Sequence, residues 1–264
     1  MTLPTTDVLT DIRGVLLDLD GTLYDANGVI PGATQAVSFM QRRGLRLRYI
    51  TNNTRRPRSA LVADLRHLGL KVSSEDLFTA PRAAVTWLEE HGIQKISLHL
   101  KDETAAEFDR FTKEDTAPEV VVVGDLGSGW TFERLNTAFR QLEGSTRLLA
   151  VQKNRYWRTE EGLVLDAGPF VAALEYASGK EAVTVGKPSQ SYFQAAAKAL
   201  AVPSTNIVVV GDDIVADVGG AIEAGMRGVL VRTGKFKPSD LACPDPRPDM
   251  VIDSIAELPH ALNF

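Results

Sequence analysis

Short apolar runs alternate with amphipathic stretches of helical length along the whole chain. The runs are rich in Val, Ile and Leu and are bounded by Gly, Asp or Asn, which predicts buried β-strands. They are Val15–Leu17, Leu45–Thr51, Val120–Val123, Ile207–Val210 and Val229–Val231. The stretches Pro57–Leu68, Ser189–Ala201 and Asp213–Ala224 have the pattern of amphipathic helices. This alternation predicts an α/β protein with a mainly parallel, Rossmann-like sheet.

Polar residues follow three of these predicted strands, at the point where each strand ends. Asp18 and Asp20 follow the first, Thr51-Asn52-Asn53 the second, and Gly211-Asp212-Asp213 a late one. Ligands of open α/β sheets bind just beyond the carboxyl ends of the strands. The three segments are therefore expected to deliver acidic and hydroxyl groups to one edge of one sheet.

The middle of the chain has strand and helix patterns, but we identify no polar strand ends of this kind within it. This difference predicts a catalytic core formed by residues 1–80 and 184–264, with residues 81–183 inserted as a smaller α/β domain. A chain of 264 residues is long enough for such an arrangement.

Composition and charge narrow the class of protein. The chain is 44% hydrophobic and 24% charged, with a formal net charge of −5, which argues against a nucleic-acid or basic membrane surface. No apolar run approaches the roughly 20 residues that a membrane helix needs. The single cysteine, Cys243, excludes an intramolecular disulfide and suits a reducing compartment. These features predict a cytoplasmic protein with no nucleic-acid or membrane partner.

Asp18 and Asp20 are the first candidates for chemistry. Being two residues apart at a strand end, they can project the same way, and Gly21 permits a sharp turn after them. Two carboxylates this close repel by roughly 4 kcal/mol at about 4 Å and an effective dielectric near 20. A divalent cation at Asp18 and protonation of Asp20 would offset that repulsion. An ordinary Asp-Gly turn is the alternative interpretation.

Two further segments could bind a phosphate group. The hydroxyl of Thr51 and the amides of Asn52 and Asn53 can donate to phosphate oxygens, although such residues also favour plain turns. Lys187, in Gly186-Lys187-Pro188, could neutralise a phosphate and orient a nucleophile. A lone lysine is more commonly just solvated, so this segment is informative only in combination.

The acids after the late strand complete a candidate magnesium site. Mg²⁺ prefers hard oxygen ligands and is usually held by one or two carboxylates, waters and substrate phosphate oxygens. Asp212 together with Asp18 meets that need, and Asp213 and Asp217 could hold metal-bound waters. The alternative is an acid-rich helix N-terminus, which is common. Each motif alone is ambiguous, whereas all of them in this order indicate phosphoryl transfer.

The ordered series Asp18-x-Asp20-Gly-Thr, Thr51-Asn52-Asn53, Gly186-Lys187-Pro188 and Gly211-Asp212-Asp213-x-x-x-Asp217 resembles the four motifs of the haloacid dehalogenase-like superfamily. The long gap before the third motif is similar to the branch with an inserted α/β cap. Gly162–Ser178 and Gly211–Phe236 resemble more closely the phospholysine/phosphohistidine/inorganic-pyrophosphate phosphatases. The resemblance implies a hydrolase that acts on a small phosphorylated metabolite, a phosphoramidate or pyrophosphate.

The resemblance also implies roles for the motif residues. Asp18 would be the nucleophile that forms an aspartyl-phosphate, and Asp20 the general acid and base. Mg²⁺ would be held by Asp18, the backbone carbonyl of Asp20 and Asp212, with Asp213 and Asp217 behind them. Thr51, Asn52 and Lys187 would hold the phosphoryl oxygens.

The cap would select the substrate. Family analogy points to Asn53 and Arg55 on the core side and to Asn154, Arg155 and Tyr156 in the cap. The chain departs here from sugar- and pyridoxal-phosphate relatives, which carry Asn-Pro-Asp in this loop. A basic cluster stands in its place, formed by Lys153, Arg155 and Arg158. It could favour a highly anionic substrate or could simply be a solvated edge.

Other functions share part of this pattern. A phosphomutase would use the same nucleophile, and a phospho-ligand-binding protein would use the same pocket without turnover, although binding alone needs no Asp20. A signalling receiver also groups acids, Thr and Lys around magnesium, but it is about half this length. Relatives with this cap often pair through it, which predicts a homodimer.

Overall fold

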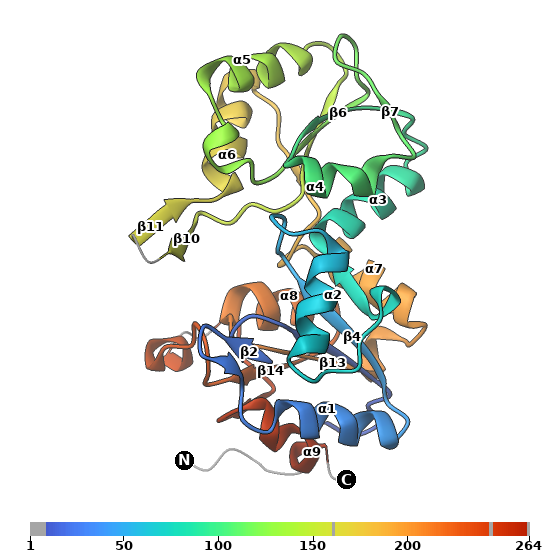
Figure 1. Ribbon diagram of the computed structural model, residues 1–264, viewed down its shortest axis with the longest axis vertical. Coiled ribbons are helices and arrows are strands. Elements are labelled where there is room, and N and C mark those ends of the chain that lie inside the picture. Colours follow the sequence, from blue (N-terminus) through green and yellow to red (C-terminus); the bar gives the residue numbers. More distant parts are fainter. Residues whose placement is uncertain (1–8, 160–161, 243–244, 263–264) are drawn as a thin grey trace. The chain divides into compact units, whose positions relative to one another are not determined.

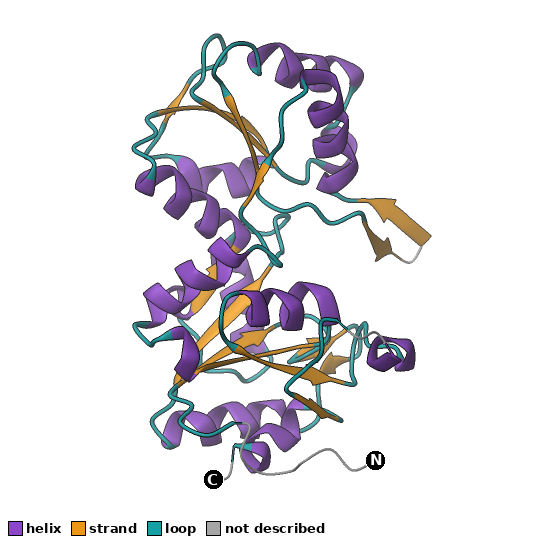
Figure 2. Cartoon of the chain, turned by 180° about the vertical axis from the view of Figure 1, so that it is seen from behind, coloured by secondary structure: helices purple, strands orange, loops and turns teal. Residues whose placement is uncertain are grey.

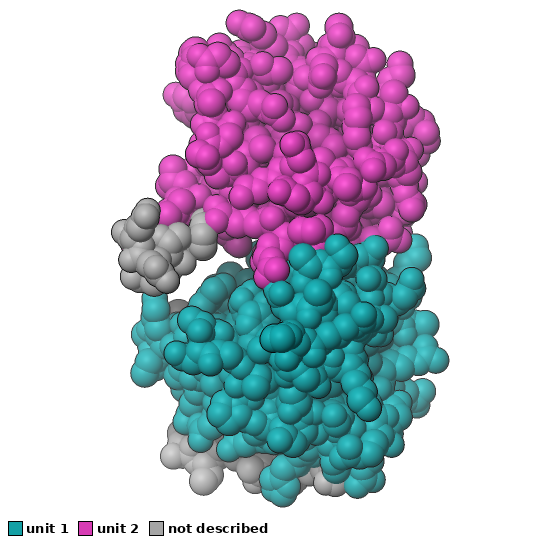
Figure 3. Space-filling view, in the orientation of Figure 1, with its two compact units in different colours: residues 1–51, 58–78, 187–264 teal, residues 52–57, 79–186 magenta. Residues whose placement is uncertain are grey.

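The computed structural model describes residues 9–159, 162–242 and 245–262 of the 264 (Figures 1 and 2), so Cys243 lies outside the described residues. The chain forms two compact units (Figure 3). Unit 1 consists of residues 1–51, 58–78 and 187–264, and unit 2 of residues 52–57 and 79–186. The loop 52–57, which the sequence analysis assigns to the first core segment, therefore groups with unit 2.

Unit 1 is built on a six-stranded sheet. Its strand order is β15-β14-β13-β1-β4-β5, and β1 runs parallel to both of its neighbours. The strands are β1 (Gly14–Asp18), β4 (Arg46–Thr51), β5 (Leu77–Thr79), β13 (Ile207–Gly211), β14 (Arg227–Val231) and β15 (Met250–Ile252). A two-stranded hairpin, β2 (Tyr24–Asp25) and β3 (Gly28–Val29), follows β1. The central strands β1 and β13 are buried along their whole length, as expected for apolar runs in a parallel sheet.

Helices cover both faces of this sheet (Figure 1). The helices are α1 (Ala33–Arg42), α2 (Arg58–His67), α7 (Gln190–Leu200), α8 (Gly220–Glu223) and α9 (Leu258–Ala261). Residues of α1, α2 and α9 share one apolar core with the β1 side chains of Val15 and Leu17. Helix α7 lies within one residue of its predicted bounds, because Ser189 caps its first turn by accepting from the Tyr192 amide.

The segment after β13 differs from the helix predicted over 213–224. Residues Ile214–Gly219 are π-helical and only Gly220–Glu223 is α-helical. The wide turn is accompanied by close packing, because a Cβ on Gly220 would overlap Phe193 and approach Pro188 O to 2.6 Å. π-helical turns are frequent at functional sites, and this one carries Asp217.

Unit 2 is a second α/β layer structure. Its parallel five-stranded sheet has the order β12-β9-β8-β6-β7. The strands are β6 (Lys95–His99), β7 (Thr112–Lys113), β8 (Val120–Val123), β9 (Arg147–Ala150) and β12 (Val183–Thr184), and the separate hairpin is β10 (Tyr156–Thr159) with β11 (Gly162–Leu165). The helices are α3 (Ala80–Glu90), α4 (Asp102–Ala105), α5 (Phe132–Gln141) and α6 (Ala167–Ser178). Helices α5 and α6 pack with β8 and β9 in one core.

Short 3₁₀ turns complete the described chain. They are Ser74–Asp76, Ala106–Phe108, Gly127–Gly129, Ser204–Asn206, Pro238–Ala242 and Ile255–Glu257. Among the described helices of either unit, none has the length and apolar character needed to cross a membrane. The parallel-sheet α/β fold predicted from the sequence is confirmed.

Candidate active site

Three predicted site segments meet at the carboxyl edge of the unit 1 sheet. Strand β1 ends at Asp18 and lies between β4, which ends at Thr51, and β13, which ends at Gly211 just before Asp212. The register pairs Asp18 with Ile50 and Leu17 with Val210, so the three strands finish at nearly the same level. Parallel strands make this convergence possible, because all their carboxyl ends lie on one side.

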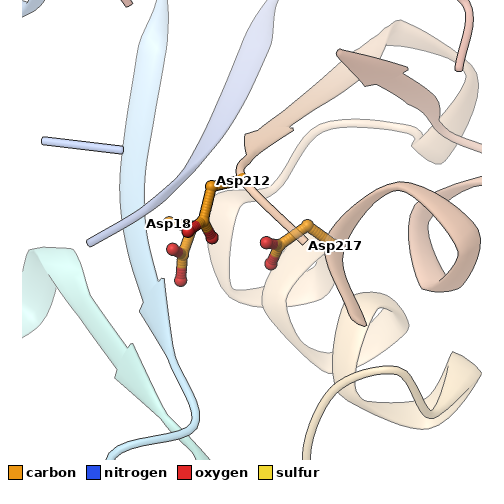
Figure 4. Close-up of side chains that lie close together, drawn as sticks. All are labelled: Asp18, Asp212 and Asp217. Atoms are coloured by element: carbon orange, nitrogen blue, oxygen red, sulfur yellow. The ribbon is translucent and has the colours of Figure 1, made fainter. Parts of the chain in front are cut away.

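Three buried carboxylates gather at this edge (Figure 4). Asp18, Asp212 and Asp217 each present an oxygen, and these atoms all lie within 4.8 Å of one another. Their side chains are almost completely buried, at 6%, 2% and 1% exposure. Asp217 reaches the cluster from the π-helical segment, four residues beyond Asp213. Its Oδ2 also accepts from the backbone amide of Asp213 at 3.2 Å.

Lys187 is the cation of this cluster. Its Nζ donates to Asp18 Oδ1 at 2.5 Å and to Asp217 Oδ1 at 2.6 Å, and its side chain is 5% exposed. Burial opposes a charged lysine, but the two carboxylates outweigh it and raise the pKa of Lys187 well above its usual value. Lys187 is therefore a permanent ammonium group that fixes one oxygen of Asp18.

The cluster holds more negative than positive charge. Burial, followed by the nearby Asp18 carboxylate, raises the pKa of Asp212 to about 7. Burial also raises the pKa of Asp217, although its Lys187 partner acts in the opposite direction. Three carboxylates face one ammonium group among these described residues. Hard carboxylate oxygens with excess negative charge fit a divalent cation, so the triad could hold a metal ion.

Asp213 turns away from the triad. Its Oδ1 caps the following turn by accepting from the amides of Val215 at 3.1 Å and Ala216 at 2.9 Å. Its Oδ2 lies 3.3 Å from the Lys235 Nζ. These partners lower the pKa of Asp213 although its burial acts in the opposite sense. Asp213 is thus an ionised helix cap beside the site.

Asp20 lies two residues beyond Asp18 and is exposed. The chain turns sharply around it, with the amides of Leu23 and Thr22 donating to Leu19 O. Asp20 forms an isolated β-bridge with Tyr24 and hydrogen-bonds with the Tyr24 hydroxyl. Burial, followed by the Asp20 charge, raises the pKa of Tyr24, so this phenol stays protonated and donates. Asp20 is therefore oriented yet accessible to solvent.

Thr51 is held by Tyr192, a residue not predicted from the sequence to belong to the site. The Thr51 amide donates to the hydroxyl of Tyr192 at 3.0 Å, and that hydroxyl donates to Phe78 O at 2.8 Å. Tyr192 is fully buried in α7 and connects the end of β4 to Phe78 in β5. A tyrosine in an amphipathic helix pattern carries no sign of this role in sequence alone.

The other predicted substrate residues belong to unit 2. In the loop after Thr51, Asn53 Oδ1 accepts from the amides of Arg55 at 3.0 Å and Arg56 at 3.2 Å. The Arg55 guanidinium forms an ion pair with Asp125, whose side chain is 3% exposed. The predicted residues Asn52, Asn53, Arg55, Asn154, Arg155 and Tyr156 all lie in this unit.

The prediction that the middle region lacks polar strand ends is wrong at Asp125. It follows β8 by two residues and is buried, just as Asp18 and Asp212 are in unit 1. The sequence does contain the pattern of a polar strand end here, because the apolar run Val120–Val123 is followed by Gly124-Asp125.

One residue of the predicted basic cluster in unit 2, Lys153, already forms an ion pair within this unit. The Lys153 Nζ donates to both oxygens of Glu175, at 2.8 and 2.7 Å. Arg155 and Tyr156 are exposed, and the Arg158 side chain lies outside the described part of the chain. Lys153 is thus committed to a partner on α6.

Comparison with known proteins identifies the family. A family model described as haloacid dehalogenase-like hydrolase matches residues 15–112, and one described as HAD-hydrolase-like matches residues 184–258. The chain is 39% identical over 253 residues to the human phospholysine phosphohistidine inorganic pyrophosphate phosphatase, covering 95% of this chain and 91% of that protein. The chain belongs to the haloacid dehalogenase-like hydrolases.

Further relatives agree with this assignment. The cattle haloacid dehalogenase-like hydrolase domain-containing protein 2 is 35% identical, over 97% of this chain and 94% of that protein. The solved structure of 4-nitrophenylphosphatase from Thermotoga maritima is 28% identical, with a TM-score of 0.90 and coverage of 97% and 100%. The predicted family and hydrolase class are confirmed, and this hydrolase is of the phosphatase type.

Proposed function

We propose that this hydrolase cleaves a small phosphorylated metabolite, a phosphoramidate or pyrophosphate through an aspartyl-phosphate on Asp18, with Mg²⁺ as cofactor. The observation that carries the proposal is the position of Asp18. Its carboxylate ends a central strand, is fixed through one oxygen by Lys187, and lies among two further acids. A buried carboxylate held in one direction is suited to attack a phosphorus atom in line.

Two displacements complete the reaction. A carboxylate oxygen of Asp18 attacks phosphorus, and the bond from phosphorus to the leaving oxygen or nitrogen breaks while Asp20 donates a proton to that atom. Water then attacks the phosphorus of the aspartyl-phosphate, and Asp20 accepts its proton as phosphate and free Asp18 form. The exposure of Asp20 and its contact with the Tyr24 hydroxyl support this role.

The acids divide into metal ligands and supporting groups. Asp18, Asp212 and the backbone carbonyl of Asp20 would hold Mg²⁺, which when bound polarises the phosphoryl group and reduces repulsion between anions. Asp217 would hold Lys187 in place, and Asp213 would fix the turn that carries Asp217. Lys187, Thr51 and Asn52 would contact the phosphoryl oxygens.

Unit 2 would be the cap that selects the substrate. Asn53, Arg55, Asn154, Arg155 and Tyr156 are its proposed contacts. The choice of phosphoramidates or pyrophosphate is supported by the names of the similar relatives, which mention phospholysine, phosphohistidine and inorganic pyrophosphate.

Two predictions concern the protein as a whole. The sequence predicts a cytoplasmic location and a homodimer formed through the cap. Light scattering after size exclusion tests the dimer: a mass near 57 kDa, about twice the 28.7 kDa chain, is expected, and a monomer at all concentrations would contradict it.

Phosphate release tests the proposed chemistry. Asp18→Asn should reduce release from 4-nitrophenyl phosphate and from pyrophosphate by on the order of 10⁴-fold or more. Chelation of divalent ions should abolish release by the unaltered protein. Circular dichroism and melting temperature serve as the control for folding. Full activity of the variant would refute the nucleophile, and full activity in excess chelator would refute the metal.

A further inference from the structure

The segment Thr233-Gly234-Lys235 follows β14 and lies against the acid cluster of unit 1. It belongs to the stretch Gly211–Phe236, one of the two that carry the closer family resemblance, and it has no role in the proposed reaction. The backbone amide of Lys235 donates to Asp212 Oδ2 at 2.6 Å. The Thr233 hydroxyl donates to the backbone carbonyl of Gly21 at 2.5 Å. One short segment therefore contacts both the loop after β1 and the acid after β13.

Gly234 and Gly21 enclose the same oxygen. Both have left-handed backbone, with φ of +62° and +82°. A Cβ added to either glycine would overlap Asp212 Oδ2, and a Cβ on Gly234 would also approach Gly21 Cα to 2.6 Å. The two backbones can come this close to the carboxylate only because neither residue has a side chain.

We propose that Thr233-Gly234-Lys235 is a positioning element of the metal site, which fixes the Asp212 carboxylate against Gly21 through the Lys235 amide. The inference rests on the proposed function, in which Asp212 is a ligand of Mg²⁺. None of the three residues is a proposed ligand, so they act through Asp212. The Thr233 hydroxyl donates to the Gly21 carbonyl and so holds in place Gly21, the second glycine beside the Asp212 carboxylate.

The chemistry of magnesium makes this positioning consequential. Mg²⁺ requires near-ideal octahedral geometry at about 2.0–2.1 Å, so a ligand displaced by a few tenths of an ångström binds it poorly. Asp212 is buried with like-charged neighbours, and one of its oxygens is committed to the Lys235 amide. That hydrogen bond and the two glycines fix the direction of the whole carboxylate.

Gly234→Ala with Gly225→Ala as the matched control tests the proposal. Gly225 has a similar φ of +75°, and among the described atoms nothing lies within 4 Å of the Cβ that it would gain. Both substitutions therefore strain the backbone, but only Gly234→Ala disturbs Asp212. Mg²⁺ affinity is measured from the rise of melting temperature with Mg²⁺ concentration, alongside the activity. Gly234→Ala should weaken Mg²⁺ binding at least tenfold more than Gly225→Ala does.

A second pair of variants applies if Gly234→Ala fails to fold. Thr233→Val removes the hydroxyl that holds Gly21, and Thr146→Val removes a comparable hydrogen bond, to Pro118 O in unit 2. Thr233→Val should weaken Mg²⁺ binding by about twofold to tenfold, and Thr146→Val should leave it unchanged.

The outcomes separate this inference from the proposed function. If the unaltered protein binds Mg²⁺ and releases phosphate, but Gly234→Ala or, where that variant does not fold, Thr233→Val matches its control in Mg²⁺ affinity, the positioning role is refuted and the proposed function stands. If the unaltered protein does not bind Mg²⁺, both the proposed metal site and the positioning role are refuted.

Discussion

Both units have buried aspartates at the carboxyl ends of sheet strands, but the partners of these carboxylates differ between the units. Each unit has a parallel sheet with buried aspartates at the ends of central strands: Asp18 is the last residue of β1 and Asp212 follows β13 in unit 1, and Asp125 follows β8 in unit 2. In unit 2 the Asp125 Oδ1 accepts from the Gly127 amide at 2.7 Å, and its Oδ2 pairs with Arg55. In unit 1 acids lie beside other acids, and Lys187 is shared between two of them.

A second acid of unit 2 shows the same contrast. Asp166 caps α6, and its Oδ1 accepts from the Ala167 amide at 2.7 Å and from the Gln152 side chain at 2.5 Å. Burial raises the pKa of Asp166 as it does that of Asp212. A buried acid with a shifted pKa is therefore not by itself a sign of catalysis. Crowding of like charges, which costs stability unless a cation binds, is the more specific sign.

Replacement of Lys187 should have the largest combined effect on stability and phosphate release. Lys187→Met leaves Asp18 and Asp217 buried without their cation, which should destabilise the fold by about 3–5 kcal/mol. Phosphate release should fall by on the order of 10³-fold or more, because Asp18 loses its anchor. Urea unfolding and a phosphate assay measure the two effects. Adding Asp217→Asn should recover part of the stability but none of the activity; recovery of activity would show that Lys187 has only a structural role.

The metal-free protein should lose stability as pH rises from about 4 to about 7. The pKa of Asp212 is raised from its ordinary value to about 7, so the folded state binds a proton that the unfolded chain has already released. Asp217 acts in the same direction, whereas the lowered pKa of Asp213 acts only below about pH 4. A pKa raised from 3.8 to about 7 corresponds to a loss of about 4 kcal/mol in the free energy of unfolding across this window.

Urea unfolding at a series of pH values, in chelator and in excess Mg²⁺, measures this dependence. Excess Mg²⁺ should flatten the profile because it binds the ionised acids. Asp212→Asn should make the profile less steep without metal, because only the contribution of Asp217 then remains at this site. A free energy of unfolding that rises from about pH 4 to about pH 7 in chelator would contradict the raised pKa of Asp212.

Asp166→Ala should lower the stability of the protein and leave its catalysis nearly unchanged. The variant loses the cap of α6 and the partner of the Gln152 side chain, so it should be destabilised by about 1–3 kcal/mol. Its kcat on 4-nitrophenyl phosphate should stay within a few-fold of the unaltered protein. A fall of kcat like that of Asp18→Asn, with the fold intact, would mean that Asp166 takes part in catalysis and is not only a helix cap.

Lys153→Ala should have the smallest effect. Lys153 is 39% exposed and pairs with Glu175, a type of contact that contributes about 0–1 kcal/mol. Because its ammonium group is already committed, KM for pyrophosphate should change by less than about twofold. A tenfold rise in KM would instead support the interpretation of residues 153–158 as a substrate-binding basic cluster.

The sequence predicted the elements that depend on local pattern and strand order. Apolar runs followed by Asp18, Thr51 and Asp212 were sufficient for the sheet and its polar edge, because parallel strands bring their ends together. The π-helical turn at Ile214–Gly219 was not predictable, since the spacing of its apolar residues is that of an α-helix. The close fit of Gly220 against Pro188 and Phe193 involves residues far apart in sequence.

The contacts that hold the site residues in place could not be predicted either, because they join residues far apart in the sequence. Tyr192 reaches Thr51 across 141 positions of sequence, and Lys235 reaches Asp212 across 23. Such pairs depend on tertiary packing and leave no local pattern. Asp125 was missed although its strand-end signal was present, and only the structure shows that Arg55 satisfies it.

Chemical trapping at Asp18 tests the central claim most directly. The enzyme is mixed with substrate and Mg²⁺, quenched in acid during turnover and treated with borohydride, which reduces an acyl phosphate to the alcohol. Peptide mass spectrometry should then find homoserine at position 18, and no conversion at Asp217 or Asp166. Continued phosphate release with unmodified Asp18, or conversion at another acid, would contradict the account.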